Sequence, residues 1–271
     1  MKFKSRITTM TVLLVTAAMS QTGAGQQLCE DRMDSSATDA ASNACLLIGG
    51  GLLAGESEYL SEDLSTGIPM IHLNYGGFFW ETTEIGFFLL GGVQENLYWG
   101  MAALLELPPN GFEAKGEAHL AGLDDRDATL EAGLMLAGGG NWGDVEIEIN
   151  VDVENEHEGS EVSAGYSFPL NFGNFTVAPG VTMRLRDEKN SNYYYGVKDS
   201  EANDTGRPAY KVDEATLSIG FGYSMEYVLG SKWMLFHSLD VISLDDAIAD
   251  SPLTVNDESE LLSFGVAYRV F

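Results

Sequence analysis

The side chains best suited to chemistry are acids that recur at alternate positions near the middle of the chain. They are Asp144, Glu146, Glu148, Asp152 and Glu154. The residues between them are mostly apolar, as in the run from Val145 to Val153. Successive side chains of a β-strand point to opposite faces, so this pattern predicts an acidic face with carboxylates about 6.6–6.8 Å apart. If the apolar face meets lipid, the acids face a lumen.

An acidic lumen has two interpretations, and the sequence leaves both open. Carboxylates crowded into a narrow space repel one another unless cations or basic side chains lie opposite them. The first interpretation is a lumen that attracts cations. The second is an interior filled and neutralised by side chains, as in small barrels. The basic residues that could point inward are Lys115, Arg184 and Lys232.

Two further candidate sites lie in polar stretches toward the C-terminus. The first contains three consecutive tyrosines, Tyr193 to Tyr195. These rings can contact a ligand, lie at a membrane interface, or fold over a barrel mouth, and we favour this structural role. The second is acidic, and its carboxylates either bridge to lipopolysaccharide through divalent cations or simply remain solvated. These acids are Asp245, Asp246, Asp250, Asp257 and Glu258.

The sequence offers no motif for catalysis or metal binding. The histidines are scattered without the spacing of metal ligands. They are His72, His119, His157 and His237. Patterns of a nucleophile elbow, a P-loop or a metalloprotease are missing as well. We therefore expect a protein that is not an enzyme and has no cofactor or metal site.

The elements that would hold these side chains are β-strands. The longest alternation runs from Ala215 to Tyr227, with Leu, Ile, Phe and Tyr on one face and Thr, Ser, Gly and Glu on the other. A membrane-spanning strand needs about 9–11 residues of this kind. About twelve strands are expected, at residues 44–54, 68–76, 78–91, 94–107, 111–121, 128–138, 142–153, 161–169, 174–185, 214–228, 232–243 and 260–271. An even number of antiparallel strands can close without a free edge, so the predicted fold class is an all-β, antiparallel transmembrane β-barrel.

The N-terminal region predicts export. Basic residues up to Arg6 precede an apolar stretch from Ile7 to Ala18, and small residues follow. This pattern predicts a signal peptide of residues 1–25 that is removed, with Ser20 as the alternative site of cleavage. Residues 26–43 would then be a periplasmic segment ahead of the barrel at 44–271. Cys29 and Cys45 flank a polar stretch, which predicts a disulfide in an oxidising compartment.

The charge balance restricts the partners. The chain has 14 Lys+Arg against 41 Asp+Glu, a formal net charge of −27. Nucleic acid is not expected, because phosphate binding needs basic patches. Cationic solutes are compatible with the acidity, and the alternative is that the acids keep the surface hydrated.

Several short motifs resemble the MipA/OmpV family of outer-membrane proteins, the MltA-interacting protein family. The family pattern around the tyrosines matches Tyr194, Tyr195, Gly196, Val197, Glu201, Pro208 and Tyr210. Further matches, in the same order along the chain, are Ile68 to Phe79, Leu120 to Asp127, His157 to Gly159 and Asp250 to Leu253. The resemblance covers roughly residues 45–271.

The resemblance implies a function as well as a location. It implies an outer-membrane barrel, in contact with lipid and lipopolysaccharide, that acts as a scaffold in peptidoglycan (murein) assembly. The implied partners are a lytic transglycosylase and a peptidoglycan synthase. The alternatives are a narrow channel that favours cations, or a porin-like protein that passes solutes or antibiotics, and an adhesin. Of these, the acidic strand face favours the channel.

Overall fold

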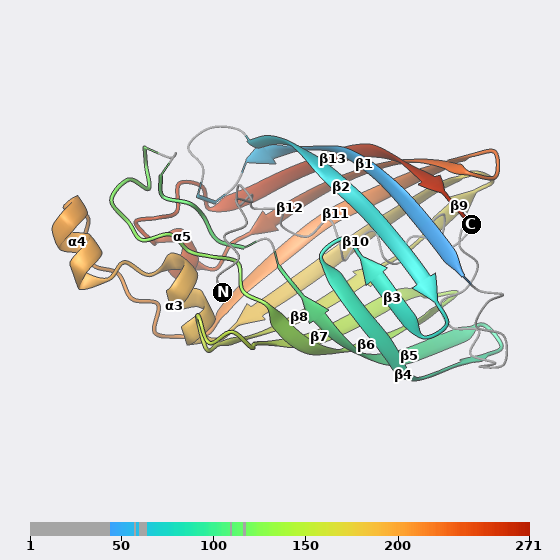
Figure 1. Ribbon diagram of the computed structural model, residues 1–271, viewed down its shortest axis with the longest axis horizontal. Coiled ribbons are helices and arrows are strands. Elements are labelled where there is room, and N and C mark those ends of the chain that lie inside the picture. The colour runs from blue at the N-terminus through green and yellow to red at the C-terminus, as the bar shows by residue number, and fades with distance from the viewer. Residues whose placement is uncertain (1–43, 57, 60–63, 109, 116–117) are drawn as a thin grey trace, which may run out of the picture.

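A computed structural model describes residues 44–56, 58–59, 64–108, 110–115 and 118–271 (Figure 1). The predicted signal peptide, the segment 26–43 and Cys29 lie outside the described residues. Cys45 is buried at the start of the first strand, while the predicted bond to Cys29 stays a prediction.

The described part of the chain forms a closed antiparallel β-barrel of twelve strands. Strands that follow one another pair with each other, except that β8 and β9 both pair with β10. β10 also pairs with β11, and β13 pairs with β1 to close the wall. The short β9 continues β8 along β10. The strands are β1 (Cys45–Glu56), β2 (Leu64–Tyr75), β3 (Phe78–Glu81), β4 (Glu84–Gln94), β5 (Leu97–Glu106), β6 (Glu131–Gly140), β7 (Gly143–Asp152), β8 (Ser160–Ser167), β9 (Leu170–Phe172), β10 (Phe175–Arg186), β11 (Thr216–Leu229), β12 (Trp233–Ser243) and β13 (Glu258–Arg269).

The two ends of the barrel differ. At the turn end, on the right in Figure 1, the connections are short and the C-terminus lies nearby. At the loop end lie the long connections 107–130, 187–215 and 244–257. These loops carry three helices, α3 (Glu188–Tyr195), α4 (Asp199–Thr205) and α5 (Asp246–Ala249). In barrels of bacterial outer membranes the short turns are periplasmic and the longer loops are extracellular.

Two of the predicted strands were wrong. The segment 78–91 is not one strand: it divides into β3 and β4 around a turn at Thr82–Thr83, where Thr82 has a φ of 41°. The turn lets Trp80 pair with Ile85 on the outside and Glu81 with Glu84 on the inside. One continuous strand would have placed Glu84 on the same face as Trp80, so a break in the alternation marks the turn.

The described residues of the predicted strand at 111–121 do not form a strand. An isolated bridge between Phe112 and Arg126 is the pairing there, and the segment belongs to the loop 107–130. Gly111 has a φ of +96°, which an extended strand residue does not adopt. The side chains of Phe112 and Leu120 are buried in the loops of the loop end rather than facing outward.

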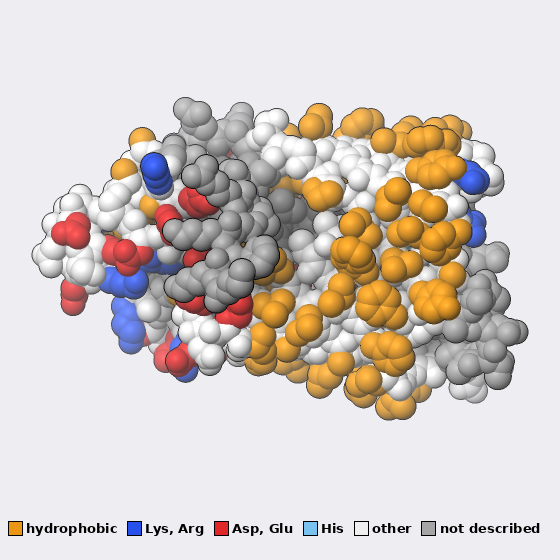
Figure 2. Space-filling view, viewed as in Figure 1, with side chains coloured by type: hydrophobic (Ala, Val, Ile, Leu, Met, Phe, Trp, Pro, Cys, Tyr) orange, Lys and Arg blue, Asp and Glu red, His pale blue; other side chains and the backbone are white. Residues whose placement is uncertain are grey.

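The outer surface of the wall is apolar. Figure 2 shows hydrophobic side chains spread over the strands, whereas most acidic and basic side chains gather at the loop end. Phe221 and Phe264, on β11 and β13, are 65% and 57% exposed. Aromatic residues with polar tips pair near the turn end, where Trp142 stacks on Tyr166 and Trp233 meets Tyr268 edge to face, and such residues favour a membrane interface. Among the described helices, none is long and apolar enough to cross a membrane.

The inside of the barrel is filled at several levels. A turn-end cluster joins buried apolar residues of β1, β2, β11, β12 and β13. Its members are Cys45, Leu47, Met70, Val228, Met234, Phe236 and Ala267. A second group, centred on Phe79 and Met135, lines the wall formed by β3, β5 and β6. The loops of the loop end fold over the opposite mouth and are called the cap below.

Candidate functional site

The polar part of the lumen lies on five neighbouring strands, and the pairing register shows how its side chains align. Asp144 of β7 lies opposite Ser167 of β8, which lies opposite Gly180 of β10. Gly180 lies opposite Gly222 of β11, and Gly222 opposite Asp240 of β12. One row of the inner wall therefore has an aspartate at each edge and small residues between.

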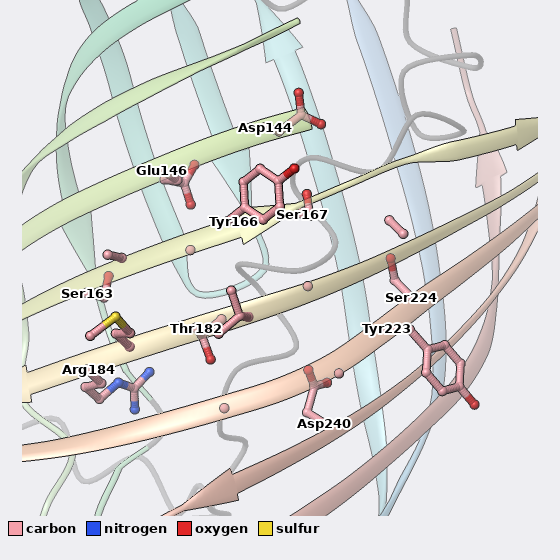
Figure 3. Close-up of a pocket in the computed structure, with 18 residues that line it drawn as sticks. Asp144, Glu146, Ser163, Tyr166, Ser167, Thr182, Arg184, Tyr223, Ser224 and Asp240 are labelled. Carbon is pink, nitrogen blue, oxygen red and sulfur yellow. The ribbon is translucent and has the colours of Figure 1, made fainter. Parts of the chain in front are cut away.

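The next row, one step toward the loop end, repeats this arrangement with another acid. Glu146 lies opposite Gly165, Gly165 opposite Thr182, and Thr182 opposite Gly220. The glycines leave room inside the wall, and a methyl group on Gly165 would meet no atom within 4 Å. A cavity of about 70 Å³ results, shown in Figure 3, with Asp144 and Glu146 on one side and Asp240 on the other.

Above the cavity, toward the cap, basic side chains neutralise part of the acidity. Glu161 of β8 forms ion pairs with both arginines of β10, with distances of 2.9 Å from its Oε1 to Arg184 Nε and 3.0 Å from its Oε2 to Arg186 Nε. Arg186 also lies beside the Tyr195 ring. This ion-paired layer separates the cavity from the cap.

The predicted acidic face divides between two places. Asp144, Glu146 and Glu148 point into the lumen, where Asp144 and Glu146 are buried. Asp152, at the end of β7, instead accepts backbone N–H groups of the loop that follows, including those of His157 and Glu158. Glu154 is exposed in the same loop and accepts the N–H of Leu130. Of the possible basic partners, Arg184 points inward, whereas Lys115 and Lys232 are exposed in connections.

The cap is a hydrophobic core built from segments far apart in the sequence. Its buried members come from residues 58–59 and from the three long loops. The rings of Tyr59 and Tyr195 stack with centroids 5.2 Å apart. The full set is Tyr59, Phe112, Ala114, Leu120, Leu123, Tyr194, Tyr195, Val197, Val212, Ile248 and Leu253. The tyrosines of the sequence motif are thus core residues of the cap.

A buried ion pair holds two of the cap loops together. Arg126 Nη2 donates to both carboxylate oxygens of Glu201, at 2.9 and 3.0 Å, and both residues are almost fully buried. Arg126 also donates to the carbonyl oxygens of Tyr193, Gly196 and Asp124. Every edge of the guanidinium is therefore bound to the loops around it.

Ionisation of groups in the cap follows from their surroundings. Burial disfavours the charged form of Glu201, but hydrogen bonds from the N–H groups of Lys198 and Asp124 and from Arg126 outweigh it and hold its pKa below the usual range. Burial raises the pKa of the Tyr195 hydroxyl, and the charge of Glu58, which accepts that hydroxyl at 3.2 Å, raises it further. At neutral pH the cap therefore contains a charged Arg–Glu pair and neutral tyrosines.

The remaining residues of the tyrosine motif also lie in the cap. Val197 and Tyr210 form a backbone bridge, and the Tyr210 hydroxyl donates to the carbonyl oxygen of Ala247 at 2.8 Å. Pro208 is exposed in the loop between α4 and this bridge. In the acidic loop, Ser251 Oγ donates to the Tyr195 carbonyl oxygen at 2.6 Å, and Asp245 caps α5.

Two residues that organise the cap had no signal in the sequence, whereas a third, His157, was indicated only by the family motif from His157 to Gly159. Tyr59 and Glu58 belong to a connection of the barrel, and nothing in their spacing indicates that they fold inward beneath Tyr195. His157 is buried against Tyr193 and Tyr194, accepts the N–H of Gly159 at Nδ1 and bonds Thr129 through Nε2. Within the described residues, no group of three or more His, Cys, Asp or Glu side chains is arranged to hold a metal ion.

Comparison with known proteins identifies the family. The family described as MltA-interacting protein MipA matches residues 48–270. The chain belongs to the MipA family. Within that family, the MltA-interacting protein of Escherichia coli K12 is 26% identical over 81% of this chain and 88% of its own length. OmpV of Vibrio cholerae is 24% identical over 78% of this chain and 75% of its own. A solved porin covers 83% of this chain at 9% identity with a TM-score of 0.32.

Membership of the MipA family gives the location of the barrel. Relatives in the family are named as outer membrane proteins, among them OmpV and Omp26La of Vibrio anguillarum. The apolar belt and the closed wall fit a bilayer, where every backbone polar group must be paired within the protein. This MipA protein is therefore an outer-membrane β-barrel.

Proposed function

We propose that this protein is a scaffold of the outer membrane that holds periplasmic enzymes of peptidoglycan assembly near the membrane. The observation that carries the proposal is the filling of the barrel. Buried apolar side chains occupy the turn-end part of the lumen, and the cap with its buried Arg126–Glu201 pair occupies the loop end. A barrel built in this way suits an anchor better than a passage. No catalytic role is assigned to it.

The name of one relative supports the choice of partner. The MltA-interacting protein of Escherichia coli K12 shares 26% identity with this chain. By analogy, the partners proposed here are a lytic transglycosylase and a peptidoglycan synthase. The turn-end connections are only a few residues long and offer little surface. We therefore assign docking to the segment 26–43, which lies outside the described residues, together with the turn end. The barrel itself would contact lipid and lipopolysaccharide.

Capture of a purified lytic transglycosylase by the full mature chain in detergent tests this scaffold. A variant that lacks residues 26–43 should lose capture while retaining a folded barrel, as judged by circular dichroism. A variant with an altered cap, Arg126→Ala, is the matched control and should capture the enzyme normally, because the cap faces away from the periplasm. Failure of the intact chain to capture the enzyme contradicts the scaffold, and unchanged capture by the truncated chain contradicts the docking segment.

A narrow pathway for cations is the second candidate, and the acidic lumen favours it. Asp144, Glu146 and Glu148 point inward, and carboxylates that line a pore select cations. Such a pathway requires the cap and the turn-end cluster to move apart. Conductance of the purified protein in planar bilayers measures this: steady cation-selective steps that Glu146→Gln reduces would favour the pathway, and a silent bilayer would favour the scaffold.

A further inference from the structure

The cavity in the lumen contains buried polar atoms that have no partner. Asp144 and Ser224 are each 4% exposed, and both line the cavity. Asp144 Oδ2 and Ser224 Oγ make no hydrogen bond, and the same holds for Asp240 Oδ2. A buried polar group without a partner costs about 1–3 kcal/mol, and more when it is charged. Three buried polar atoms without partners around one cavity indicate that a ligand binds there.

The wall around the cavity leaves these atoms accessible from inside. The Tyr98 hydroxyl donates to Asp144 Oδ1, so one oxygen of this carboxylate is held in place and the other is left over. In the row of the wall that runs from Asp144 to Asp240, the residues between the two aspartates are Ser167, Gly180 and Gly222, which have small side chains or none. Figure 3 shows Asp240 and Ser224 along the lower side of the cavity, with Asp144 and Glu146 along the upper side.

The charges of the lining select the kind of ligand. Three carboxylates line the cavity, from Asp144, Glu146 and Asp240, against one guanidinium, that of Arg184. Arg184 is already paired with Glu161 at 2.9 Å, so the local excess is negative. The atoms without partners are acceptors or hydroxyls, so a ligand that satisfies them must donate hydrogen bonds.

A cation with N–H groups meets both requirements. A bare metal ion does not, since among the described residues no cluster of three acidic, histidine or cysteine side chains is set to hold one. We propose that the lumen cavity binds a small organic ammonium ion, whose N–H groups donate hydrogen bonds to Asp144 Oδ2, Ser224 Oγ and Asp240 Oδ2. This site goes beyond the scaffold function, because it exists in a closed barrel whether or not a partner is attached.

Titration of the full mature chain in detergent with ethanolammonium chloride tests the site. Isothermal titration calorimetry should give saturable binding. Tetramethylammonium chloride carries the same charge without N–H donors, and sodium chloride controls for ionic strength. Neither should bind saturably. An absence of saturable ethanolammonium binding overturns the proposal, and equal binding of tetramethylammonium overturns the requirement for N–H donors and with it the site as described.

Two variants place the binding in this cavity. Asp144→Asn should weaken binding by about tenfold or more, the loss expected for one hydrogen bond to a charged group. Gly165→Leu should abolish it, because its side chain would fill open space without changing any charge. Glu95→Gln, at an exposed acid of the turn end, is the matched control and should bind like the natural protein. Circular dichroism and heat-modifiable gel migration verify folding, and unchanged binding by folded Gly165→Leu contradicts the site.

Discussion

The cap and the lumen cavity contain similar side chains but use them differently. In the cap, Arg126 and Glu201 bind each other and the backbone around them. In the cavity, Asp144 and Ser224 retain atoms without partners. Polar groups that satisfy one another stabilise a fold, whereas polar groups left over in a cavity are available to a ligand. The cap is therefore the region that closes the barrel, and the lumen cavity is the region that can bind a ligand.

The largest expected effect comes from breaking the buried pair of the cap. Arg126→Ala should destabilise the cap by about 3–5 kcal/mol, because it leaves the Glu201 carboxylate buried without its partner. Hydrogen exchange of the loops 107–130 and 187–215, measured by mass spectrometry, should accelerate strongly while the strands remain protected.

An exposed pair in the same loops provides the control. Lys198 Nζ lies 2.9 Å from Asp124 Oδ2, with both side chains more than half exposed. Lys198→Ala should cost less than about 1 kcal/mol. Equal exchange in the two variants would show that the buried pair does not hold the cap.

Acid should loosen the cap only at a pH below the usual pKa range of a carboxyl group. The pKa of Glu201 is lower in the folded protein than its usual value, so ionisation of this group stabilises the cap above the unfolded pKa of about 4.3. That contribution is lost as the pH falls through the lowered, folded pKa. Protease cleavage of the cap loops should therefore rise steeply only below about pH 4.

Glu201→Gln checks the cause of this pH dependence. The variant should be cleaved more readily than the natural protein at neutral pH, and its cleavage should change little on acidification. If the variant retains the same acid transition as the natural protein, another group controls the cap.

The smallest expected effects come from a matched pair of serines. Ser251 Oγ in the cap donates to the Tyr195 carbonyl oxygen and accepts the N–H of Leu253, so Ser251→Ala should cost about 0.5–1.5 kcal/mol. Ser224 Oγ has no partner, and Ser224→Ala should leave stability unchanged or slightly raised. Thermal unfolding of the two variants measures the difference, and a larger loss for Ser224→Ala would contradict the assignment of the two regions.

The sequence predicted the class of fold but not every strand. Alternation identified the wall because the outer face of the strands is apolar and the inner face is polar or small over part of their length, and a pattern of this kind can be read from neighbouring residues. Two errors offset each other: the turn at Thr82–Thr83 adds a strand, and the loss of 111–121 removes one. The number twelve was therefore right although two of its members were wrong. Alternating residues also occur in a loop that packs against a core, as Phe112 does.

The candidate sites were harder to place, because they depend on contacts between distant segments. Asp144, Glu146 and Glu148 could be assigned to one face from spacing alone. The presence of a cavity could not, since it depends on small residues of three strands meeting in two adjacent rows, with Gly180 beside Gly222 in one row and Gly165 and Gly220 on either side of Thr182 in the next. The cap likewise requires Arg126 to meet Glu201 across 75 residues, and only the folded chain brings the two together.

The shortness of β3 has a mechanical consequence. The first and last strands of the wall are joined from Leu47 to Glu56, whereas β3 is joined to β2 only from His72 to Tyr75. Hydrogen-bonded ladders resist shear in proportion to their length, so a barrel pulled or heated to failure should split beside this short strand. The pairing of β1 with β13, which closes the barrel, is much longer than that of β2 with β3. The expected point of rupture therefore lies one hairpin away from the closing pair.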